Sequence, residues 1–131
     1  MTLVDTSVWI ATFRKVRPLD LDALVGFDEV VTCLPVIQEV LQGFRDEVPF
    51  RRARAAMFAL PRVESPMGAE LFDEAVELDR SARRSGLTVR STVECLIAAC
   101  AIRHGPEVLH IDRDFTALAR VSPLRQRRAR S

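Results

Sequence analysis

Four acidic residues stand where an alternation of strands and helices could bring them together. Asp5 and Asp112 each directly follow a short apolar run that is typical of a buried strand. Glu39 lies at the edge of the apolar face of a predicted helix, and Glu94 heads a helix face that should be buried. Because the carboxyl ends of parallel strands meet at one edge of a sheet, we expect the four carboxylates to share a pocket.

The chemistry of such a pocket follows from its charge. Four carboxylates with no lysine or histidine among them repel one another and raise each other's pKa unless a cation lies between them. Oxygen ligands with open coordination positions suit Mg²⁺ or Mn²⁺. An ion held in this way activates a water molecule and stabilises charge on a phosphoryl group. The residues therefore indicate hydrolysis of a phosphodiester bond.

Each acidic residue also has a simpler explanation. Asp5 could cap the helix that follows it, and the turn Asp112-Arg113-Asp114 could contain another cap, with Asp114 as the favoured residue. Glu39 could be a solvated residue at a helix border. Glu94 stands three residues after Ser91 and fits a capping box, in which the glutamate reaches back to the start of its own helix. A carboxylate in the first turn of a helix can fill both roles.

The apolar pattern predicts short strands that alternate with helices. Strands are expected at about 1–4, 30–34 and 107–111, and helices from 6, from 35, and at about 49–60, 68–84, 91–103 and 115–120. This alternation favours an α/β fold with a parallel sheet that helices cover on both faces. The last segment, 125–131, is polar and basic, and we expect it to be a flexible tail.

Composition limits the classes of function. The chain has 131 residues, which suits one domain, and is 48% hydrophobic. Its net charge of +1 means that any nucleic-acid contact depends on local basic patches. Three cysteines without a paired motif indicate buried thiols in a cytoplasmic protein, and two histidines supply a Cys/His zinc site poorly. The longest apolar run is too short to span a membrane, so no membrane partner is expected.

Four segments occur in an order and spacing that are specific when they are taken together. They are LVDTSVWI at the N-terminus, PVIQEVLQG in the middle, TVRSTVECLIAACAIRHG, and VLHIDRDFTALA near the end. With them the chain resembles the PIN-domain ribonucleases, and most closely the VapC toxins of type II toxin–antitoxin systems. The resemblance covers essentially the whole chain. It implies a single PIN-like domain over 1–131, an α/β/α sandwich with a central parallel sheet of four to five strands.

The same resemblance implies an activity and its partners. The expected protein is a metal-dependent endoribonuclease toxin that uses Mg²⁺ or Mn²⁺ to cleave structured RNA such as tRNA or rRNA. A small VapB-like antitoxin would silence it, and the toxin would form a homodimer. The helical region at about 49–86 resembles the clip-like arm that serves dimer and antitoxin contacts. Its Ala56, Phe58 and Leu60 would leave apolar surface uncovered in an isolated domain, although a solvated pair of Arg-rich helices has a similar composition.

By the resemblance, Asp5, Glu39, Glu94 and Asp112 occupy the catalytic acidic positions, with Asp5, Glu94 and Asp112 as metal ligands. One position departs from the family pattern, because the third acid is usually aspartate and here it is Glu94. Glutamate is one methylene longer, and Mg²⁺ requires near-ideal octahedral geometry. Activity is therefore expected either to be intact with a shifted ion or to be attenuated.

Supporting roles are expected at four other positions. Thr6 or Ser7 resembles the polar residue that supports the first aspartate, and Asp114 resembles an auxiliary acid. Arg90 lies just ahead of the helix that carries Glu94, so it is the arginine that we expect to contact RNA phosphate.

Two other functional classes are compatible with some of these features. A phospho-acceptor regulatory domain needs paired acids after the first strand and a lysine after a late strand. Here Thr6 follows Asp5, and the single lysine is Lys15, so this class is disfavoured. The alternative that remains is a catalytically weakened PIN domain that acts as an RNA-binding or protein-interaction module, because Glu94 departs from the family pattern. A metal-dependent cleavage assay separates it from an active enzyme.

Overall fold

Four short parallel strands form the centre of the fold in a computed structural model, which describes residues 1–130. The strands are β1 (Thr2–Val4), β2 (Val30–Val31), β3 (Glu107–His110) and β4 (Gln126–Arg128), and their order in the sheet is β2-β1-β3-β4. In the register of β1, Leu3 lies opposite Val31 on one side and opposite Val108 on the other. The predicted parallel sheet is confirmed.

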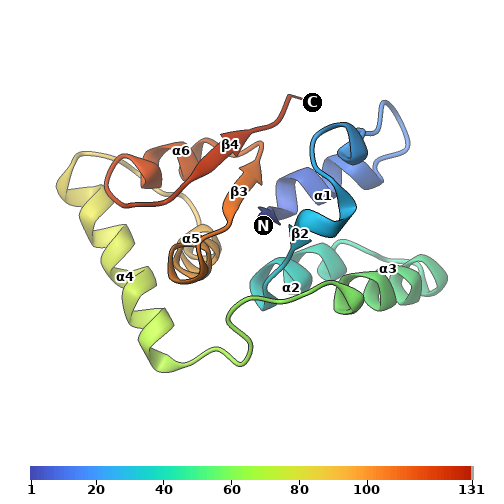
Figure 1. The fold of residues 1–131 in the computed structure, drawn as a ribbon, viewed down its shortest axis with the longest axis horizontal. Helices are drawn as coiled ribbons and strands as arrows, with labels where there is room; N and C mark the ends of the chain where they lie inside the picture. The colour runs from blue at the N-terminus through green and yellow to red at the C-terminus, as the bar shows by residue number, and fades with distance from the viewer. Residues whose placement is uncertain (131) are drawn as a thin grey trace.

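Helices lie on both faces of this sheet, as predicted. α1 (Thr6–Phe13) is on one side, whereas α5 (Thr92–His104) and α6 (Arg113–Ala119) are on the other (Figure 1). α2 (Leu34–Gln42) packs against both α1 and α5. α5 is apolar nearly all round because the sheet and α4 (Ala69–Arg84) cover it from different sides.

The region 49–86 differs from the single arm that the sequence suggested. α3 (Glu47–Ala59) packs against α2, whereas α4 packs along α5, and Figure 1 shows the two helices at opposite ends of the molecule. Leu60 was expected on the surface, but it is buried because the chain turns into the core after α3. Phe58 is half-exposed, with the guanidinium groups of Arg54 and Arg62 above its ring at 5.0 and 5.5 Å. The role of this region in dimer and antitoxin contacts stays a prediction.

The prediction of a flexible basic tail is wrong for residues 125–130. β4 pairs in parallel with β3, so that Val108 lies opposite Gln126, and Ala129 is buried. The guanidinium group of Arg127 binds the carboxylate of Glu107 at 3.1 Å. Backbone pairing holds this segment, and a polar sequence gives no sign of such pairing. Ser131 lies outside the described residues.

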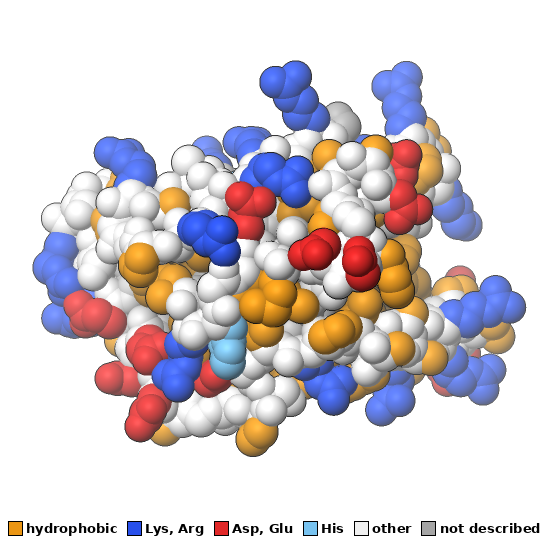
Figure 2. Space-filling view, in the orientation of Figure 1, with side chains coloured by type: hydrophobic (Ala, Val, Ile, Leu, Met, Phe, Trp, Pro, Cys, Tyr) orange, Lys and Arg blue, Asp and Glu red, His pale blue; other side chains and the backbone are white. Residues whose placement is uncertain are grey.

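The state of the cysteines and the mix of surface charges agree with what the composition indicated. Cys33, Cys95 and Cys100 are buried and none forms a disulfide, which confirms the predicted thiols. Basic and acidic side chains are interspersed over the face that Figure 2 shows, in keeping with the small net charge. Within residues 1–130, no helix combines the length and the apolar character that a membrane crossing requires.

Candidate metal centre

Asp5 lies where β1 ends and α1 begins, and its two carboxylate oxygens have different surroundings. Oδ2 accepts hydrogen bonds from the backbone N–H of Ser7 at 3.0 Å and from the Ser7 hydroxyl at 2.6 Å, so Asp5 does cap α1. Oδ1 is buried and has no hydrogen-bond partner in the described part of the chain. A buried carboxylate oxygen without a donor costs free energy unless a cation approaches it. The cap and the candidate ligand are therefore the same residue.

Ser7 and Thr6 support different carboxylates. The Ser7 hydroxyl also accepts a hydrogen bond from the backbone N–H of Ile111 at 3.0 Å, which ties the end of β1 to the end of β3. The Thr6 hydroxyl donates to Oε1 of Glu39 at 2.8 Å. Of the two residues expected to support Asp5, the geometry gives this role to Ser7, while Thr6 holds Glu39.

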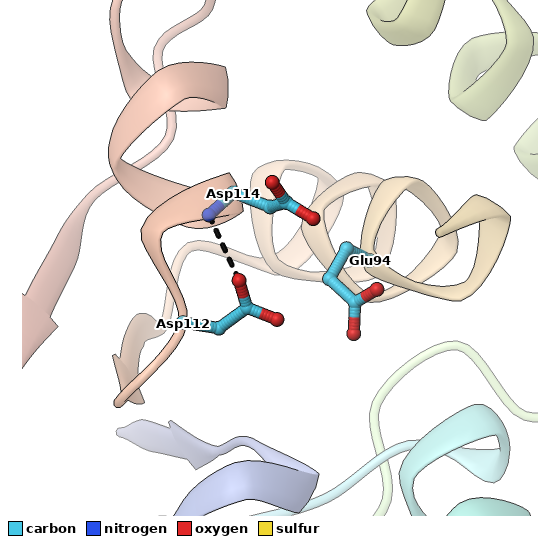
Figure 3. Close-up of side chains that lie close together, drawn as sticks. All are labelled: Glu94, Asp112 and Asp114. Atoms are coloured by element: carbon cyan, nitrogen blue, oxygen red, sulfur yellow. Dashed lines mark hydrogen bonds between the residues drawn. The ribbon is translucent and has the colours of Figure 1, made fainter. Parts of the chain in front are cut away.

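The tightest group of carboxylates joins α5 to the start of α6. One oxygen each from Glu94, Asp112 and Asp114 lies within 4.8 Å of the others, and Figure 3 shows the three groups facing one another. Oδ1 of Asp112 accepts a hydrogen bond from the backbone N–H of Asp114 at 2.9 Å, so Asp112 is the residue that caps α6. Asp114, which could have been a cap, instead accepts a hydrogen bond from the backbone N–H of Arg90 at 3.1 Å.

Glu94 does not form the capping box that its sequence context allows. Ser91 caps α5, because its hydroxyl accepts a hydrogen bond from the Val93 N–H at 3.2 Å. Within residues 1–130, the reciprocal bond from the Ser91 N–H to Glu94 is not formed. The Glu94 carboxylate is buried near the Ser91 side chain and faces Asp112 and Asp114.

Burial and crowding raise the pKa values of two of these acids. Burial raises the pKa of Glu94 to about 7, and the charges of Asp5, Asp112 and Glu39 add to the rise. Burial also raises the pKa of Asp5 to about 6, although the Ser7 hydrogen bonds oppose the rise. The structure thus brings the four sequence-predicted acids into one electrostatic neighbourhood, and Asp114 joins them.

The donor set fits a small hard cation. The candidate ligands are all carboxylate oxygens, several of which lie close together, and within residues 1–130 none of them forms an ion pair. The unpartnered Oδ1 of Asp5 adds a buried oxygen that is available for an ion. Oxygen-only sites of this kind suit Mg²⁺ or Mn²⁺ better than metals that prefer nitrogen or sulfur.

His110 is a part of the site that the sequence did not reveal. Its fully buried ring accepts a hydrogen bond at Nδ1 from the Asp112 N–H at 3.0 Å. Nε2 therefore carries the hydrogen and donates it to Oε1 of Gln126 at 2.6 Å. Burial lowers the pKa of His110, so the ring is held neutral. The only signal in the sequence is a histidine two residues before an aspartate that follows a strand.

Two arginines beside the site were also missed. An open hollow of about 650 Å³ adjoins the cluster, lined by Ser7, Arg90, Ile111, Asp112, Arg113 and Arg128. Arg90 was expected near the site, and it is among the residues that line this hollow. Arg113 follows Asp112 directly in sequence, which could have drawn attention to it. Arg128 was placed in the supposed tail, and only the pairing of β4 with β3 brings it here.

Comparison with known proteins agrees with this architecture. The PIN domain family matches residues 2–121. VapC ribonuclease Mb1587 from Mycobacterium bovis and ribonuclease VapC11 from Mycobacterium tuberculosis are each 35% identical to this chain over 129 residues, covering 95% of it and 96% of their own length. The crystal structure of VapBC-5, a member of the VapBC family of toxin-antitoxin systems from Mycobacterium tuberculosis, matches with a TM-score of 0.69 at 25% identity and covers 98% of both chains. Because sequence and fold agree over nearly the whole length, the chain belongs to the PIN domain family, in its VapC branch.

Proposed function

We propose that this chain is the toxin of a VapBC-type pair, an endoribonuclease that hydrolyses RNA with the help of Mg²⁺ or Mn²⁺. The observation that carries the proposal is the buried, unpartnered Oδ1 of Asp5 in the same neighbourhood as Glu39, Glu94 and Asp112. Relatives named VapC ribonucleases, 35% identical over 95% of the chain, support the choice of RNA as the substrate.

The acidic residues have distinct proposed roles. Asp5, Glu94 and Asp112 would hold the ion, and Asp114 would assist them from the start of α6. Glu39 would act beside them as the fourth catalytic acid. A bound ion would supply an activated water and would stabilise the charge that develops on the phosphate.

Other side chains keep these carboxylates in place. Ser7 fixes one oxygen of Asp5 and leaves the other available, while Thr6 orients Glu39. His110 fixes the backbone of Asp112 through its neutral ring. The backbone N–H of Arg90 fixes Asp114, and its guanidinium group would contact the RNA backbone at the hollow that Arg90 helps to line. This support from both the N-terminal and the C-terminal halves of the chain favours an active enzyme.

A cleavage assay tests the proposal. The purified protein is incubated with tRNA and with rRNA in the presence of Mg²⁺, Mn²⁺ or EDTA. We expect cleavage with either ion, none with EDTA, and a loss of at least about 100-fold in the Asp5→Asn variant, because each ligand of such a site is needed in the transition state. Asp73→Asn, which removes an exposed acid from α4, is the matched control and should cleave normally. Cleavage that persists in EDTA or in Asp5→Asn would contradict the metal-dependent mechanism.

The alternative function predicts a different result in the same assay. A catalytically weakened PIN domain would bind RNA without cleaving it under any of these conditions. The position of Glu94 supports an active enzyme. Its side chain is longer than that of the aspartate usual in the family, and it still places an oxygen within 4.8 Å of oxygens of Asp112 and Asp114.

The proposed partners are a small antitoxin and a second copy of the chain. VapBC-5, a solved relative, belongs to a family of toxin-antitoxin systems, which supports an antitoxin partner. The product of the reading frame next to this gene should co-purify with the protein and suppress RNA cleavage. A neighbouring product that neither binds nor inhibits would contradict this part of the proposal.

A further inference from the structure

Three arginines lie beside the acidic cluster, by which we mean Glu94, Asp112 and Asp114. They come from separate parts of the chain. Arg90 precedes α5, Arg113 opens α6 and Arg128 ends β4. All three line the same open hollow of about 650 Å³, whose wall also includes Asp112. The fold thus gathers positive charge directly beside the carboxylates that are proposed to hold an ion.

These three guanidinium groups are not used inside the protein. Within residues 1–130, none of them forms an ion pair or a hydrogen bond, and the contact of Arg90 with Asp114 is made by its backbone N–H. Arg127, next in the chain to Arg128, is by contrast bound to Glu107 and to the carbonyl oxygen of Leu24. Guanidinium groups whose N–H donors are all available suit the oxygens of a phosphate.

Two other hollows share lining residues in succession with this one and are also lined by arginines. The second shares Ile111 and Arg128 with the first and adds Arg130. The third joins Arg130 to Arg14 and Arg17. Figure 2 shows basic side chains projecting along the edge of the molecule where the described chain ends. A row of this kind fits a chain of phosphates better than it fits one isolated anion.

We propose that Arg90, Arg113 and Arg128 form a phosphate subsite, which holds the backbone of a single RNA strand immediately to one side of the bond that is cut. The inference rests on the proposed function, because it places the scissile phosphate at the acidic cluster. A subsite that binds phosphate rather than bases acts on every sequence alike. It contributes to the binding of substrate rather than to the chemical step. An acidic segment of a protein partner is the competing occupant, but the row of hollows leads to the point where a phosphodiester must lie for hydrolysis.

Binding to RNA gives the first test. In the Asp5→Asn background, without divalent ions, the affinity for a mixed-sequence single-stranded RNA of about 20 nucleotides is measured at increasing salt. Each lost phosphate contact should lower the slope of log affinity against log salt by about 0.7, so Arg113→Gln/Arg128→Gln should lower it by about 1.4. Arg45→Gln/Arg120→Gln removes the same charge at exposed sites away from the hollow and should leave the slope unchanged. Equal effects of the two double variants would overturn the subsite.

Cleavage kinetics separate the subsite from the proposed function. In the wild-type background, Arg113→Gln/Arg128→Gln should raise KM about tenfold with kcat nearly unchanged. If the enzyme is active and the double variant has an unchanged KM, the proposal of the phosphate subsite is contradicted, whereas the proposed function is not. If the wild-type protein cleaves no RNA although the double variant weakens RNA binding, the proposed function fails, the position beside a cleaved bond fails with it, and only phosphate binding by these arginines is supported.

Chemical probes decide the occupant and its position. One uncharged methylphosphonate linkage is placed at successive positions on either side of the cut. A linkage on one side of the cut only should weaken RNA binding to the protein that keeps both arginines. The same linkage should have little effect on RNA binding to Arg113→Gln/Arg128→Gln. Equal effects on both sides would overturn the one-sided arrangement. A decaglutamate peptide that loses affinity in the double variant, while RNA does not, would assign the hollow to an acidic protein partner and overturn the proposal.

Discussion

Asp5 and Glu94 hold protons more tightly in the folded protein than in the unfolded chain. Burial raises their pKa values to about 6 and about 7, so below neutral pH a cation must displace protons to reach them. The affinity for Mn²⁺ should therefore rise with pH up to about 7 and level off above it. Below both pKa values, the affinity should fall about tenfold per pH unit for each proton displaced. Calorimetric titration with Mn²⁺ from pH 5 to pH 8, about one unit outside each pKa, measures this pH dependence. An affinity that does not change over this range would contradict the prediction.

Replacing Asp5 by asparagine should make the metal-free protein more stable at high pH. A raised acid pKa means that stability is greatest when the group is protonated and is lost as the pH rises from about 4 to about 6. The shift corresponds to about 3 kcal/mol, and an amide oxygen can still accept the Ser7 hydrogen bonds. In urea denaturation with EDTA, we expect Asp5→Asn to gain about 1–3 kcal/mol at pH 8 and almost nothing at pH 4. Asp73→Asn is the control, and the same gain at both pH values would rule out the ionised carboxylate as the cause.

Shortening Glu94 distinguishes the two accounts of that residue. A site adapted to glutamate should lose RNA cleavage in Glu94→Asp, because Mg²⁺ tolerates little geometric error. A site weakened by an aspartate-to-glutamate change should gain cleavage. Since the Glu94 carboxylate already lies within 4.8 Å of Asp112 and Asp114, we expect a loss. Cleavage rates measured across Mg²⁺ and Mn²⁺ titrations decide the question, and unchanged rates would remove Glu94 from the ligands.

At the scale of elements, Ser7 is the link between two strands. Its hydroxyl is bonded to Asp5 at the end of β1 and to the backbone N–H of Ile111 after β3. Ser7→Ala removes the acceptor of the Ile111 N–H and leaves Oδ2 of Asp5 with the backbone N–H of residue 7 alone, so it should lower the free energy of unfolding by about 1–3 kcal/mol. It should also weaken Mn²⁺ binding. Urea denaturation against Ser85→Ala, which alters an exposed serine, measures the effect. A loss no greater than that of the control would show that the two strand ends do not depend on this hydroxyl.

The strands and helices with an apolar pattern could be predicted from the sequence, whereas the last strand could not. Strands and helices with an apolar periodicity were predicted within a few residues, because burial imposes that periodicity on the chain. The strand at Gln126–Arg128 has no such pattern, since backbone pairing and the bond from His110 to Gln126 hold it. The acids Asp5 and Asp112 were predicted because strand ends mark them. Arg128 was not, because its place in the site depends on that unseen strand.

At the scale of the whole molecule, α4 carries an exposed apolar surface that lines a groove. Phe72 and Val76 are 48% and 57% exposed, and they line a groove with Val89 and Leu96. Burial of such a surface in a second copy is the expected basis of a homodimer. Sedimentation velocity should show a dimer for the wild-type chain and a monomer for Phe72→Glu/Val76→Glu. The matched control Val48→Glu on α3 should stay dimeric, and a monomeric wild-type protein would refute the prediction.

The hydrogen bond between Ser7 and Ile111 joins residues that are 104 positions apart, and it has a consequence for synthesis. The ribosome adds Asp5 long before Asp112, so a nascent chain holds only part of the acidic cluster until Asp112 has been made. β1 also lacks its neighbour β3 until then. Contacts of such long range form late in folding. The candidate metal centre can therefore assemble only after the segment that carries β3 and Asp112 has left the ribosome.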